Sequence, residues 1–382
     1  MKIAIDGAGF PRNPTGVTNI TISIANALAT ANPDWEIYLL TNGEVHADVQ
    51  KMIHKLPNLT LIVEPLPVLQ SYAIFWSLFK VNLLVKKIKP DYFIAPNFLV
   101  SPFFFQHKIP TIVFVHDLVH RKFRDTMKRI TKLHMDSLFK YSLRKTNVIW
   151  CNSNYTSKEL SNHFARIVKR KKVFTGSALN DSFLEKVKLS HNNESYIERI
   201  TSKRKPYLLF VGTLAPRKNL IFLLHLYKKL SESFTLVIVG AKGWGAASDE
   251  IINLLKEPGY PKDDIVFPGY VTVEQLINIY KNAFLFISTS LDEGLGLPQL
   301  EAMACGCPVI SPHNSAMIEV VEGAGITVRG WEEADWLQAI ETIKANREMY
   351  KQKGFERVAA YSWTEVINRF KQDVLEDQEA IK

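Results

Sequence analysis

Short apolar runs alternate with helical patterns along most of the chain. In the first half, runs of strand-like composition cover residues 2–7, 36–40, 59–64, 92–95, 111–117 and 147–153, with helical segments between several of them. A second series covers residues 206–213, 234–240, 264–269, 283–289 and 307–312. This alternation predicts an α/β fold in which parallel sheets are connected by crossover helices.

The two series of runs predict two domains. Residues 184–206 are polar and charged and show no sheet pattern, so they are predicted to connect a first domain, residues 1–183, to a second domain, residues 207–361. Both domains are expected to be doubly wound, Rossmann-like and separated by a cleft. Apolar residues at helical spacing in the final segment, 362–382, predict an amphipathic helix that returns to the first domain.

The composition is that of a soluble globular protein large enough for two cores. The chain has 382 residues, of which 47% are hydrophobic and 22% are charged. Its N-terminus lacks the apolar segment of a signal peptide, which predicts a cytoplasmic location. Three cysteines are an odd number and argue against a disulfide framework. Cys305 and Cys307 have too few further ligands nearby to predict a zinc site.

Positive charge is concentrated in the first half. The chain carries a formal charge of +9, and residues 1–185, with 24 Lys and Arg against 13 Asp and Glu, account for +11. Residues 121–172 alone hold 15 basic and 3 acidic side chains. Such a surplus suits an anionic membrane surface, a phosphorylated substrate or nucleic acid, and equally a solvated basic face. No nucleic-acid-binding motif is present, so nucleic acid is not an expected partner.

The stretch just upstream favours the membrane. Residues 72–89, "YAIFWSLFKVNLLVKKIK", combine bulky apolar side chains with lysines at one end, as in a helix that lies in a membrane interface. A buried helix with a lysine-rich exit explains the same pattern. Peripheral contact with the inner face of the membrane and a buried helix are therefore both open interpretations of this stretch.

Two glutamates mark the stretch "LDEGLGLPQLEAMACGCPVI", residues 291–310. The pattern predicts a strand, a glycine-rich loop and a helix that starts near Leu297, where the amides of the first turn suit a phosphate. Glu301 is expected in that first turn, where it could accept hydrogen bonds from a ribose diol. Glu293 could accept them from a second set of hydroxyls. Taken singly, a helix-favoured acid and a solvated loop residue are the simpler interpretations.

Two adjacent cations follow the first strand of the second series. Arg217 and Lys218 lie in "GTLAPRKNL", residues 212–220, with Asn219 placed to cap the next helix. A diphosphate leaving group gains negative charge as its bond breaks, and an Arg fork with a Lys point charge would neutralise it. The pair therefore suggests transfer from a nucleoside diphosphate.

The chain resembles the retaining glycosyltransferases of family GT4, which have the GT-B fold. The resemblance rests on "VGTLAPRKN" and on residues 267–310, which contain that family's Glu-x7-Glu motif; it is dense over residues 212–309. It implies that Arg217 and Lys218 hold the diphosphate of a nucleotide sugar, Glu301 its ribose and Glu293 the transferred sugar. Further donor-binding residues by resemblance are Gly16, Gly212, Tyr270, Val271, Gly294, Leu295, Gly296 and Leu297.

The resemblance also assigns two places in the first domain. Gly16 would belong to a loop facing the diphosphate and the acceptor, although family members often have two adjacent glycines where this chain has Thr15 and Gly16. His116, at the end of a predicted strand, would contact the donor sugar and the reacting centre. Asp117 is a lesser candidate. The family needs no metal ion and no cofactor beyond its sugar nucleotide.

The resemblance leaves the substrates open. GDP-mannose is the first donor considered, with UDP, ADP and dTDP sugars as alternatives, and the acceptor is expected to be a glycan or a lipid-linked glycan of bacterial surface polysaccharide assembly. The expected mechanism is front-side attack with retention. Alternatives are a nucleotide-sugar epimerase, a phosphorylase and a non-catalytic sugar-binding protein. A dehydrogenase is disfavoured, because prolines at 11 and 14 interrupt the helix that should follow "DGAGF".

Overall fold

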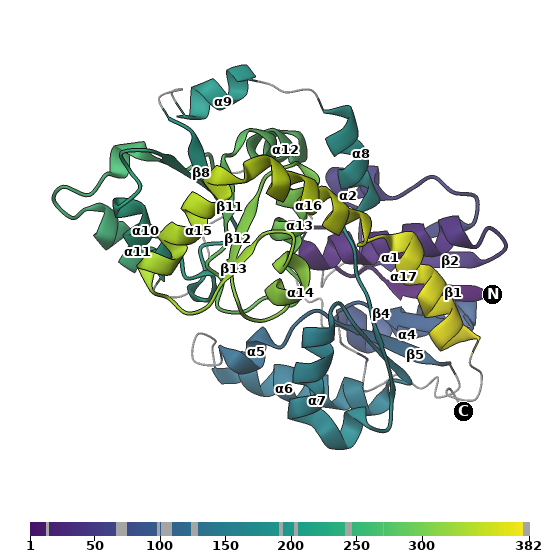
Figure 1. Cartoon of the computed structure of the whole chain (residues 1–382). Helices are drawn as coiled ribbons and strands as arrows, with labels where there is room; N and C mark the ends of the chain where they lie inside the picture. The colour runs from purple at the N-terminus through teal and green to yellow at the C-terminus, as the bar shows by residue number, and fades with distance from the viewer. Residues whose placement is uncertain are drawn as a thin grey trace. The chain divides into compact units, whose positions relative to one another are not determined.

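The structure is a computed structural model that describes residues 1–12, 15–65, 75–97, 100, 109–123, 129–190, 194–201, 205–240, 247–269 and 271–376. The chain divides into two compact units (Figure 1). The first comprises Met1–Asp181 together with Ser362–Lys382, and the second comprises Ser182–Tyr361.

The first unit is built on a seven-stranded sheet in the order β3-β2-β1-β4-β5-β6-β7, and every pairing in it is parallel. Its strands are β1 (Lys2–Asp6), β2 (Glu36–Thr41), β3 (Leu59–Val63), β4 (Tyr92–Ala95), β5 (Thr111–Val115), β6 (Val148–Cys151) and β7 (Lys172–Thr175). All five residues of β5 are buried. Such continuously apolar strands are typical of a parallel sheet covered by helices on both faces.

Helices follow most of these strands. α1 begins at Gly16 because the Thr15 side chain caps it, accepting a hydrogen bond from the Thr18 amide at 3.3 Å. The helices of this unit are α1 (Gly16–Ala31), α2 (Ala47–Met52), the π-helix η1 (Trp76–Lys80), α4 (Val81–Ile88), α5 (Val119–Lys122), α6 (Arg129–Lys145), α7 (Asn154–Val168), α17 (Trp363–Phe370) and the π-helix η5 (Lys371–Leu375).

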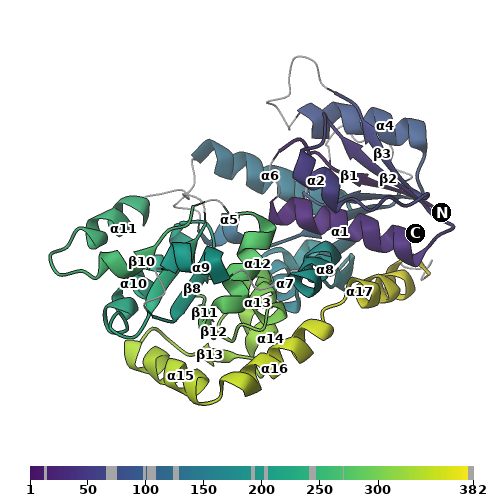
Figure 2. The ribbon, with the colours of Figure 1, turned by 90° about the horizontal axis from the view of Figure 1, so that it is seen from above.

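The C-terminal helix packs on the first sheet, as the sequence predicts. The Phe370 ring stacks on Trp150 of β6 with the ring centroids 4.4 Å apart. The Arg369 guanidinium donates a hydrogen bond to the carbonyl of Thr175 at 3.0 Å. α17 also lies against α1 (Figure 2). These contacts place residues from both ends of the chain in one unit.

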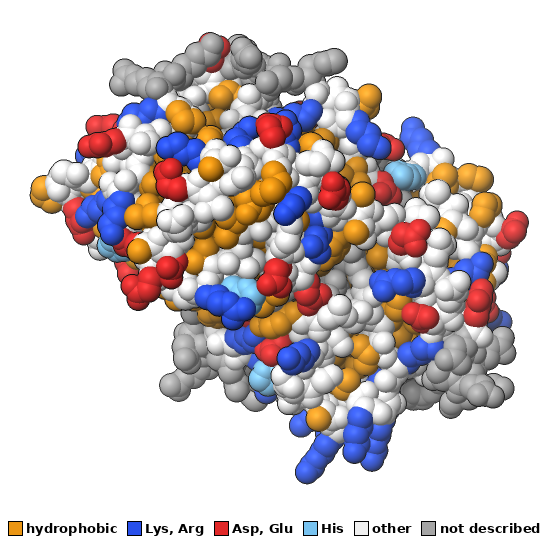
Figure 3. Space-filling model, viewed as in Figure 1, with side chains coloured by type: hydrophobic (Ala, Val, Ile, Leu, Met, Phe, Trp, Pro, Cys, Tyr) orange, Lys and Arg blue, Asp and Glu red, His pale blue; other side chains and the backbone are white. Residues whose placement is uncertain are grey.

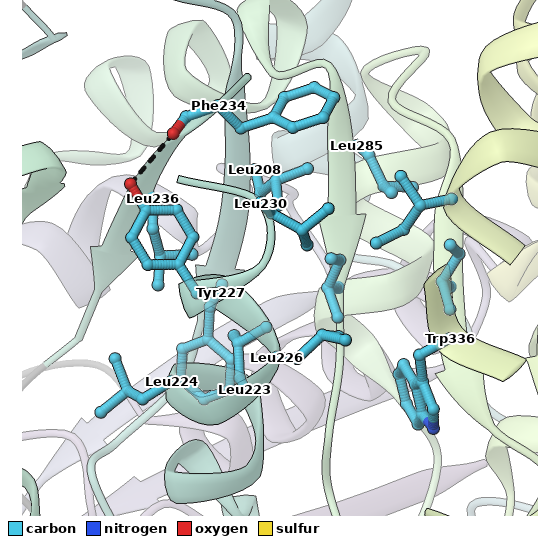
Figure 4. Packing of buried hydrophobic residues seen from close by; sticks show 14 of the residues in the cluster. Leu208, Leu223, Leu224, Leu226, Tyr227, Leu230, Phe234, Leu236, Leu285 and Trp336 are labelled. Atoms are coloured by element: carbon cyan, nitrogen blue, oxygen red, sulfur yellow. Dashed lines mark hydrogen bonds between the residues drawn. The ribbon is translucent and has the colours of Figure 1, made fainter. Parts of the chain in front are cut away.

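The second unit is built on a six-stranded parallel sheet in the order β10-β9-β8-β11-β12-β13. Its strands are β8 (Tyr207–Val211), β9 (Thr235–Val239), β10 (Ile265–Val266), β11 (Leu285–Ile287), β12 (Val309–Pro312) and β13 (Ile326–Val328). One face of this sheet packs on α10 (Leu220–Lys228) through a core of leucines (Figure 4). The Tyr227 hydroxyl in that core donates to the carbonyl of Phe234 at 2.9 Å.

The predicted connection over residues 184–206 is largely helical and belongs to the second unit. α8 (Asp181–Leu189) and α9 (Glu194–Thr201) form there. The Lys281 ammonium of α12 (Val273–Asn282) donates to the carbonyls of Val187 at 2.8 Å and Ser190 at 2.9 Å. The helices of this unit are α8 (Asp181–Leu189), α9 (Glu194–Thr201), the 3-10 helix η3 (Pro216–Lys218), α10 (Leu220–Lys228), α11 (Ala247–Leu255), the 3-10 helix η4 (Lys262–Asp264), α12 (Val273–Asn282), α13 (Leu297–Ala304), α14 (Met317–Val321), α15 (Glu333–Ala345) and α16 (Arg347–Ala359).

Each apolar run of the sequence forms a strand, and two further strands lie outside the predicted runs. These are β7 and β13, which form one edge of the first sheet and one edge of the second. Both are short and only partly buried, and β7 begins with a lysine. An edge strand is covered less than a central one, so it lacks the apolar run by which the others were predicted.

The basic segment 121–172 spans α6, β6 and α7, with residues 124–128 outside the described part. Figure 3 shows lysine and arginine side chains gathered at the foot of the view, where Figure 1 places α7. No helix of the described chain combines the length and the apolar composition needed to cross a bilayer.

Candidate active site

The candidate site lies at the carboxyl ends of the central strands of the second sheet. The chain order reverses between β8 and β11, which are neighbours, and open α/β sheets bind ligands at such a switch point. Hydrogen bonds join the loops that follow these two strands. The Leu291 amide donates to the carbonyl of Arg217 at 2.7 Å, and the Thr289 hydroxyl donates to the carbonyl of Lys218 at 2.9 Å.

Arg217 and Lys218 end the turn of 3-10 helix that follows β8. A glycine lets the lysine lie along the strand end: a Cβ atom at Gly212 would come within 3.1 Å of Lys218 Cε. Asn219 does not cap α10 with its side chain, contrary to the sequence prediction, but turns the chain into the helix with a left-handed backbone, φ 48°. The two cations are thereby directed to the carboxyl edge of the sheet.

Both cations pair with Glu293. Arg217 Nη1 lies 2.9 Å from Glu293 Oε2, and the Lys218 ammonium donates to Oε1. The Ser290 hydroxyl donates to the same Oε1 at 2.8 Å. Burial by itself would raise the pKa of Glu293, but the charges of Lys218 and Arg217 and the hydrogen bonds outweigh it and lower the pKa to about 2. Glu293 is thus a buried carboxylate held ionised by two cations.

The backbone of Glu293 is fixed by the loop that follows β12. Its amide donates to Ser315 Oγ at 3.1 Å, and its carbonyl accepts a hydrogen bond from the Ala316 amide at 3.3 Å. Ser315 adopts a left-handed conformation, φ 51°, which is uncommon for a residue with a side chain. Three adjacent strands therefore contribute to holding one carboxylate.

Glu301 is the second glutamate of the motif and lies in the second turn of α13. It is the fifth residue of the helix, so its predicted place in the first turn is wrong. The Tyr280 hydroxyl of α12 donates to Glu301 Oε2 at 3.0 Å. Burial raises the pKa of Glu301 to about 7, against the lowering effects of the Tyr280 hydrogen bond and the Lys218 charge. This carboxyl therefore titrates near neutral pH.

The start of α13 lies between the two glutamates. Gly296 precedes Leu297 with φ 100°, a conformation that favours glycine, and the first amides of a helix have no acceptor within it. The buried Oε1 of Gln299 has no hydrogen-bond partner among the described residues. Gly294 and Leu295 complete the loop, and Leu295 is buried. The arrangement suits an anion at the helix N-terminus.

Tyr270 and Val271 are the other two residues of this unit that the resemblance assigns to donor binding. Val271 is half-buried and lies two residues before α12, while Tyr270 is outside the described residues. Among the residues that the structure describes, no group of three or more His, Cys, Asp or Glu side chains is arranged to hold a metal ion. The expected independence from metal stays a prediction.

His116 and Gly16 belong to the first unit. His116 follows β5, and its Nε2 bonds the carbonyl of Pro96 at 2.8 Å, which places the proton on Nε2. Burial lowers the pKa of His116, so the ring is neutral at pH 7. Gly16 is the first residue of α1, with open space where a Cβ would lie. Asp117 accepts a hydrogen bond from the Val119 amide at 3.1 Å, a structural role at the start of α5.

The structure brings Arg217, Lys218 and Glu293 into contact, and it adds residues that the sequence did not single out. Ser290 stands within the predicted strand-to-loop stretch, so its place beside Glu293 was accessible from the motif. Ser315 and Tyr280 lie 22 residues after Glu293 and 21 residues before Glu301, on other elements. Only the order of strands and helices reveals that they meet the glutamates.

Known families match both halves of the chain. The profile of "Glycosyltransferase Family 4" matches residues 14–175, and that of "Glycosyl transferases group 1" matches residues 192–354. Together they cover every strand of the two sheets except β1, and every described residue of the candidate site.

Individual relatives agree with the family profiles. O-antigen chain mannosyltransferase B of Escherichia coli is 34% identical over 177 residues, which are 43% of this chain and 45% of that protein. O-antigen chain mannosyltransferase RfbU of Salmonella typhimurium is 29% identical over 244 residues, which are 62% of this chain and 63% of that protein. The matched regions thus span less than two thirds of either relative.

A solved structure supports the fold. Sucrose-phosphate synthase from Thermosynechococcus elongatus superimposes with a TM-score of 0.74 at 19% identity, covering 98% of both chains. A likeness at this identity speaks for architecture alone, and the architecture is the GT-B fold with its two parallel-sheet Rossmann-like domains. With both family profiles, the relatives and the fold in agreement, the chain belongs to the group 1 glycosyltransferases of family 4.

Proposed function

We propose that this protein transfers a hexose from a nucleotide-diphosphate sugar to a glycan or lipid-linked acceptor, with retention of configuration. Mannose is the first hexose to test. The observation that carries the proposal is the convergence of Arg217, Lys218 and Glu293 at the switch point of the second sheet. Two cations gathered there suit a diphosphate, which is the leaving group common to such donors.

In the proposed complex the diphosphate takes over the cations that Glu293 occupies in the structure. A guanidinium and an ammonium that hold one buried carboxylate can hold a phosphate oxygen in the same way. The nearby N-terminus of α13 adds amide donors for the same charge. Glu293, released from part of its ion pairing, can then accept hydrogen bonds from sugar hydroxyls.

Glu301 is assigned to the ribose. Glu301 is half-buried, and the Tyr280 hydroxyl donates a hydrogen bond to one of its carboxyl oxygens. A ribose diol offers two hydroxyl donors, which a carboxylate accepts well and a protonated carboxyl accepts poorly. The pKa of Glu301 is raised because burial disfavours its charge more than its partners stabilise it, and such shifts are frequent at binding sites.

The proposed chemical step is a front-side displacement. The bond between the anomeric carbon and the phosphate oxygen breaks, the acceptor oxygen bonds to the same face of that carbon, and its proton goes to the departing phosphate. Arg217 and Lys218 stabilise the charge that develops on the diphosphate. Glu293 stabilises the positive charge at the anomeric centre, and neutral His116 is assigned to the sugar.

The relatives guide the choice of substrates to test. Both named relatives are O-antigen chain mannosyltransferases, which makes GDP-mannose the first donor and a bacterial surface polysaccharide intermediate the first acceptor. The proposal places the reaction at the cytoplasmic face of the membrane, where such donors are available. It requires no metal ion, because the two cations perform the charge neutralisation that Mg²⁺ would otherwise supply.

A thermal-shift panel of nucleoside diphosphates and sugar nucleotides tests the proposal. A ligand at a hundredfold its Kd adds about 2.7 kcal/mol to the free energy of unfolding, so the correct base and sugar should stand out. If no member of the panel raises the Tm, the donor site is wrongly assigned. An absorbance typical of bound pyridoxal would favour the phosphorylase alternative, and conversion of the sugar without release of nucleotide would favour the epimerase.

A further inference from the structure

The helix formed by η1 and α4 has one face anchored in the core of the first unit. Trp76, Val81 and Val85 are fully or almost fully buried there, and the Trp76 indole donates to the buried carboxyl of Asp6 at 2.8 Å. Figure 2 shows α4 running along the first sheet. Because its inner face is already packed, this helix is a fixed element of the unit, and its outer face is not required for the core.

The outer face of that helix carries an exposed apolar stripe, defined here as Phe75, Phe79 and Leu83. Their exposed fractions are 37%, 42% and 63%. The rings of Phe75 and Phe79 are in contact, with centroids 4.9 Å apart, and Leu83 follows four residues later. A stripe of three large apolar side chains on a solvent-facing helix surface is a recognised mark of an interaction site.

The same helix carries only positive charge. Lys86, Lys87 and Lys89 are exposed at its C-terminal end, and the segment 75–89 contains no aspartate or glutamate. Lys80, the residue after Phe79, is paired with Glu64, which directly follows β3, at 2.8 Å. Large apolar side chains beside lysines, with no acidic residue on the same helix, are typical of helices that lie in the interface of an anionic bilayer. The net charge of +11 on residues 1–185 also favours attraction to an anionic surface.

We propose that the apolar stripe inserts into an anionic lipid surface, with Lys86 and Lys87 at the level of the headgroups. The positive charge of the helix favours an anionic membrane as the partner. A bilayer rich in anionic lipid attracts the lysines and accepts the aromatic rings, whereas an uncharged bilayer only accepts the rings. The inference concerns a surface of the first unit and does not depend on the donor site. It would bring a lipid-linked acceptor and the enzyme to the same surface.

Co-sedimentation of the full chain with lipid vesicles tests the proposal. The probe is a vesicle of phosphatidylglycerol and phosphatidylethanolamine, compared with one of phosphatidylcholine alone. We expect the wild type to bind the anionic vesicles, to lose binding as the salt concentration rises and to bind phosphatidylcholine weakly. Phe79→Ser with Leu83→Ser, and separately Lys86→Glu with Lys87→Glu, should each weaken binding about tenfold or more.

A matched control distinguishes binding through the apolar stripe from nonspecific hydrophobic binding. Leu189 is 77% exposed in the second unit, and Leu189→Ser should leave vesicle binding unchanged. All the substituted side chains are exposed, so the Tm should stay near that of the wild type, which confirms that the variants fold. The proposal is overturned if the wild type ignores anionic vesicles or if the stripe variant binds them as tightly. A stripe-dependent self-association without vesicle binding would equally overturn it, in favour of a protein contact.

Discussion

The ammonium of Lys218 and the carboxylate of Glu293 form a buried ion pair at the carboxyl edge of the second sheet. Arg217 pairs with the other carboxylate oxygen at 2.9 Å. Both side chains that the proposed function assigns to a diphosphate are therefore engaged by an acid of the same site. In the proposed complex, phosphate oxygens of the donor replace that carboxylate at Arg217 and Lys218, so donor binding would release Glu293.

Glu293→Gln should separate binding from turnover. The neutral amide competes less for Arg217 and Lys218, so a nucleoside diphosphate should bind on the order of tenfold more tightly. Sugar transfer should fall on the order of a hundredfold, because the charge that stabilises the anomeric centre is lost. Isothermal titration calorimetry and a transfer assay measure the two effects.

The control for that substitution is Glu257→Gln, which removes an exposed carboxylate paired with Lys228 in the same unit. It should change neither quantity. If folded Glu293→Gln binds the nucleotide equally or more weakly than the wild type, phosphate does not replace the Glu293 carboxylate at the two cations. That result would not refute donor binding at the site.

Glu301→Gln should stabilise the protein at alkaline pH when no ligand is added. The pKa of Glu301 is about 7 in the folded state against an ordinary 4.5. A raised carboxyl pKa gives full stability below the unfolded value, and that stability is lost as the pH rises through the folded value. The loss amounts to about 3 kcal/mol above pH 7. Chemical unfolding at pH 8 and pH 5 should show a gain for the variant at pH 8 and little at pH 5. A stabilisation of equal size at both would contradict the assignment.

Tyr280→Phe should move the pH dependence of donor binding. The Tyr280 hydrogen bond lowers the pKa of Glu301, so its removal raises the pKa further. Because the proposed ribose binding needs the ionised carboxylate, affinity for a sugar nucleotide should rise through a midpoint near pH 7 in the wild type and through a higher one in the variant. Dissociation constants across this range measure the shift, and Glu301→Gln should remove the dependence. An unchanged midpoint in Tyr280→Phe would exclude a positioning role.

Much of the fold is readable from the sequence, because buried parallel strands are apolar throughout and the runs repeat. The edge strands β7 and β13 are not, since their exposure permits polar residues. Within the site, the resemblance to the family predicts Glu293, Glu301, Arg217 and Lys218 as donor-binding residues. It does not reveal that Glu293 pairs with both cations or that Tyr280 supports Glu301. Those contacts join separate elements and depend on which strands are neighbours in the sheet.

Phe370→Ala should test the place of the C-terminal helix in the first unit. The Phe370 ring is fully buried between Trp150 and Phe174, with a centroid 4.4 Å from the first and 5.3 Å from the second. Removing it leaves a cavity and should cost about 3–5 kcal/mol of unfolding free energy. Phe355→Ala, at a ring that is 40% exposed, is the control and should cost far less. Chemical denaturation compares them; equal losses would refute the packing role of α17.

Direct titration of a sugar nucleotide into the protein tests the central claim most directly. Isothermal titration calorimetry with GDP-mannose, or with whichever donor raises the Tm most, should show saturable binding to the wild type. Arg217→Ala with Lys218→Ala should weaken it at least about tenfold, whereas Lys228→Ala, at an exposed ion pair, should not. The account is contradicted if no sugar nucleotide binds the wild type, or if the doubly substituted protein keeps the wild-type Kd.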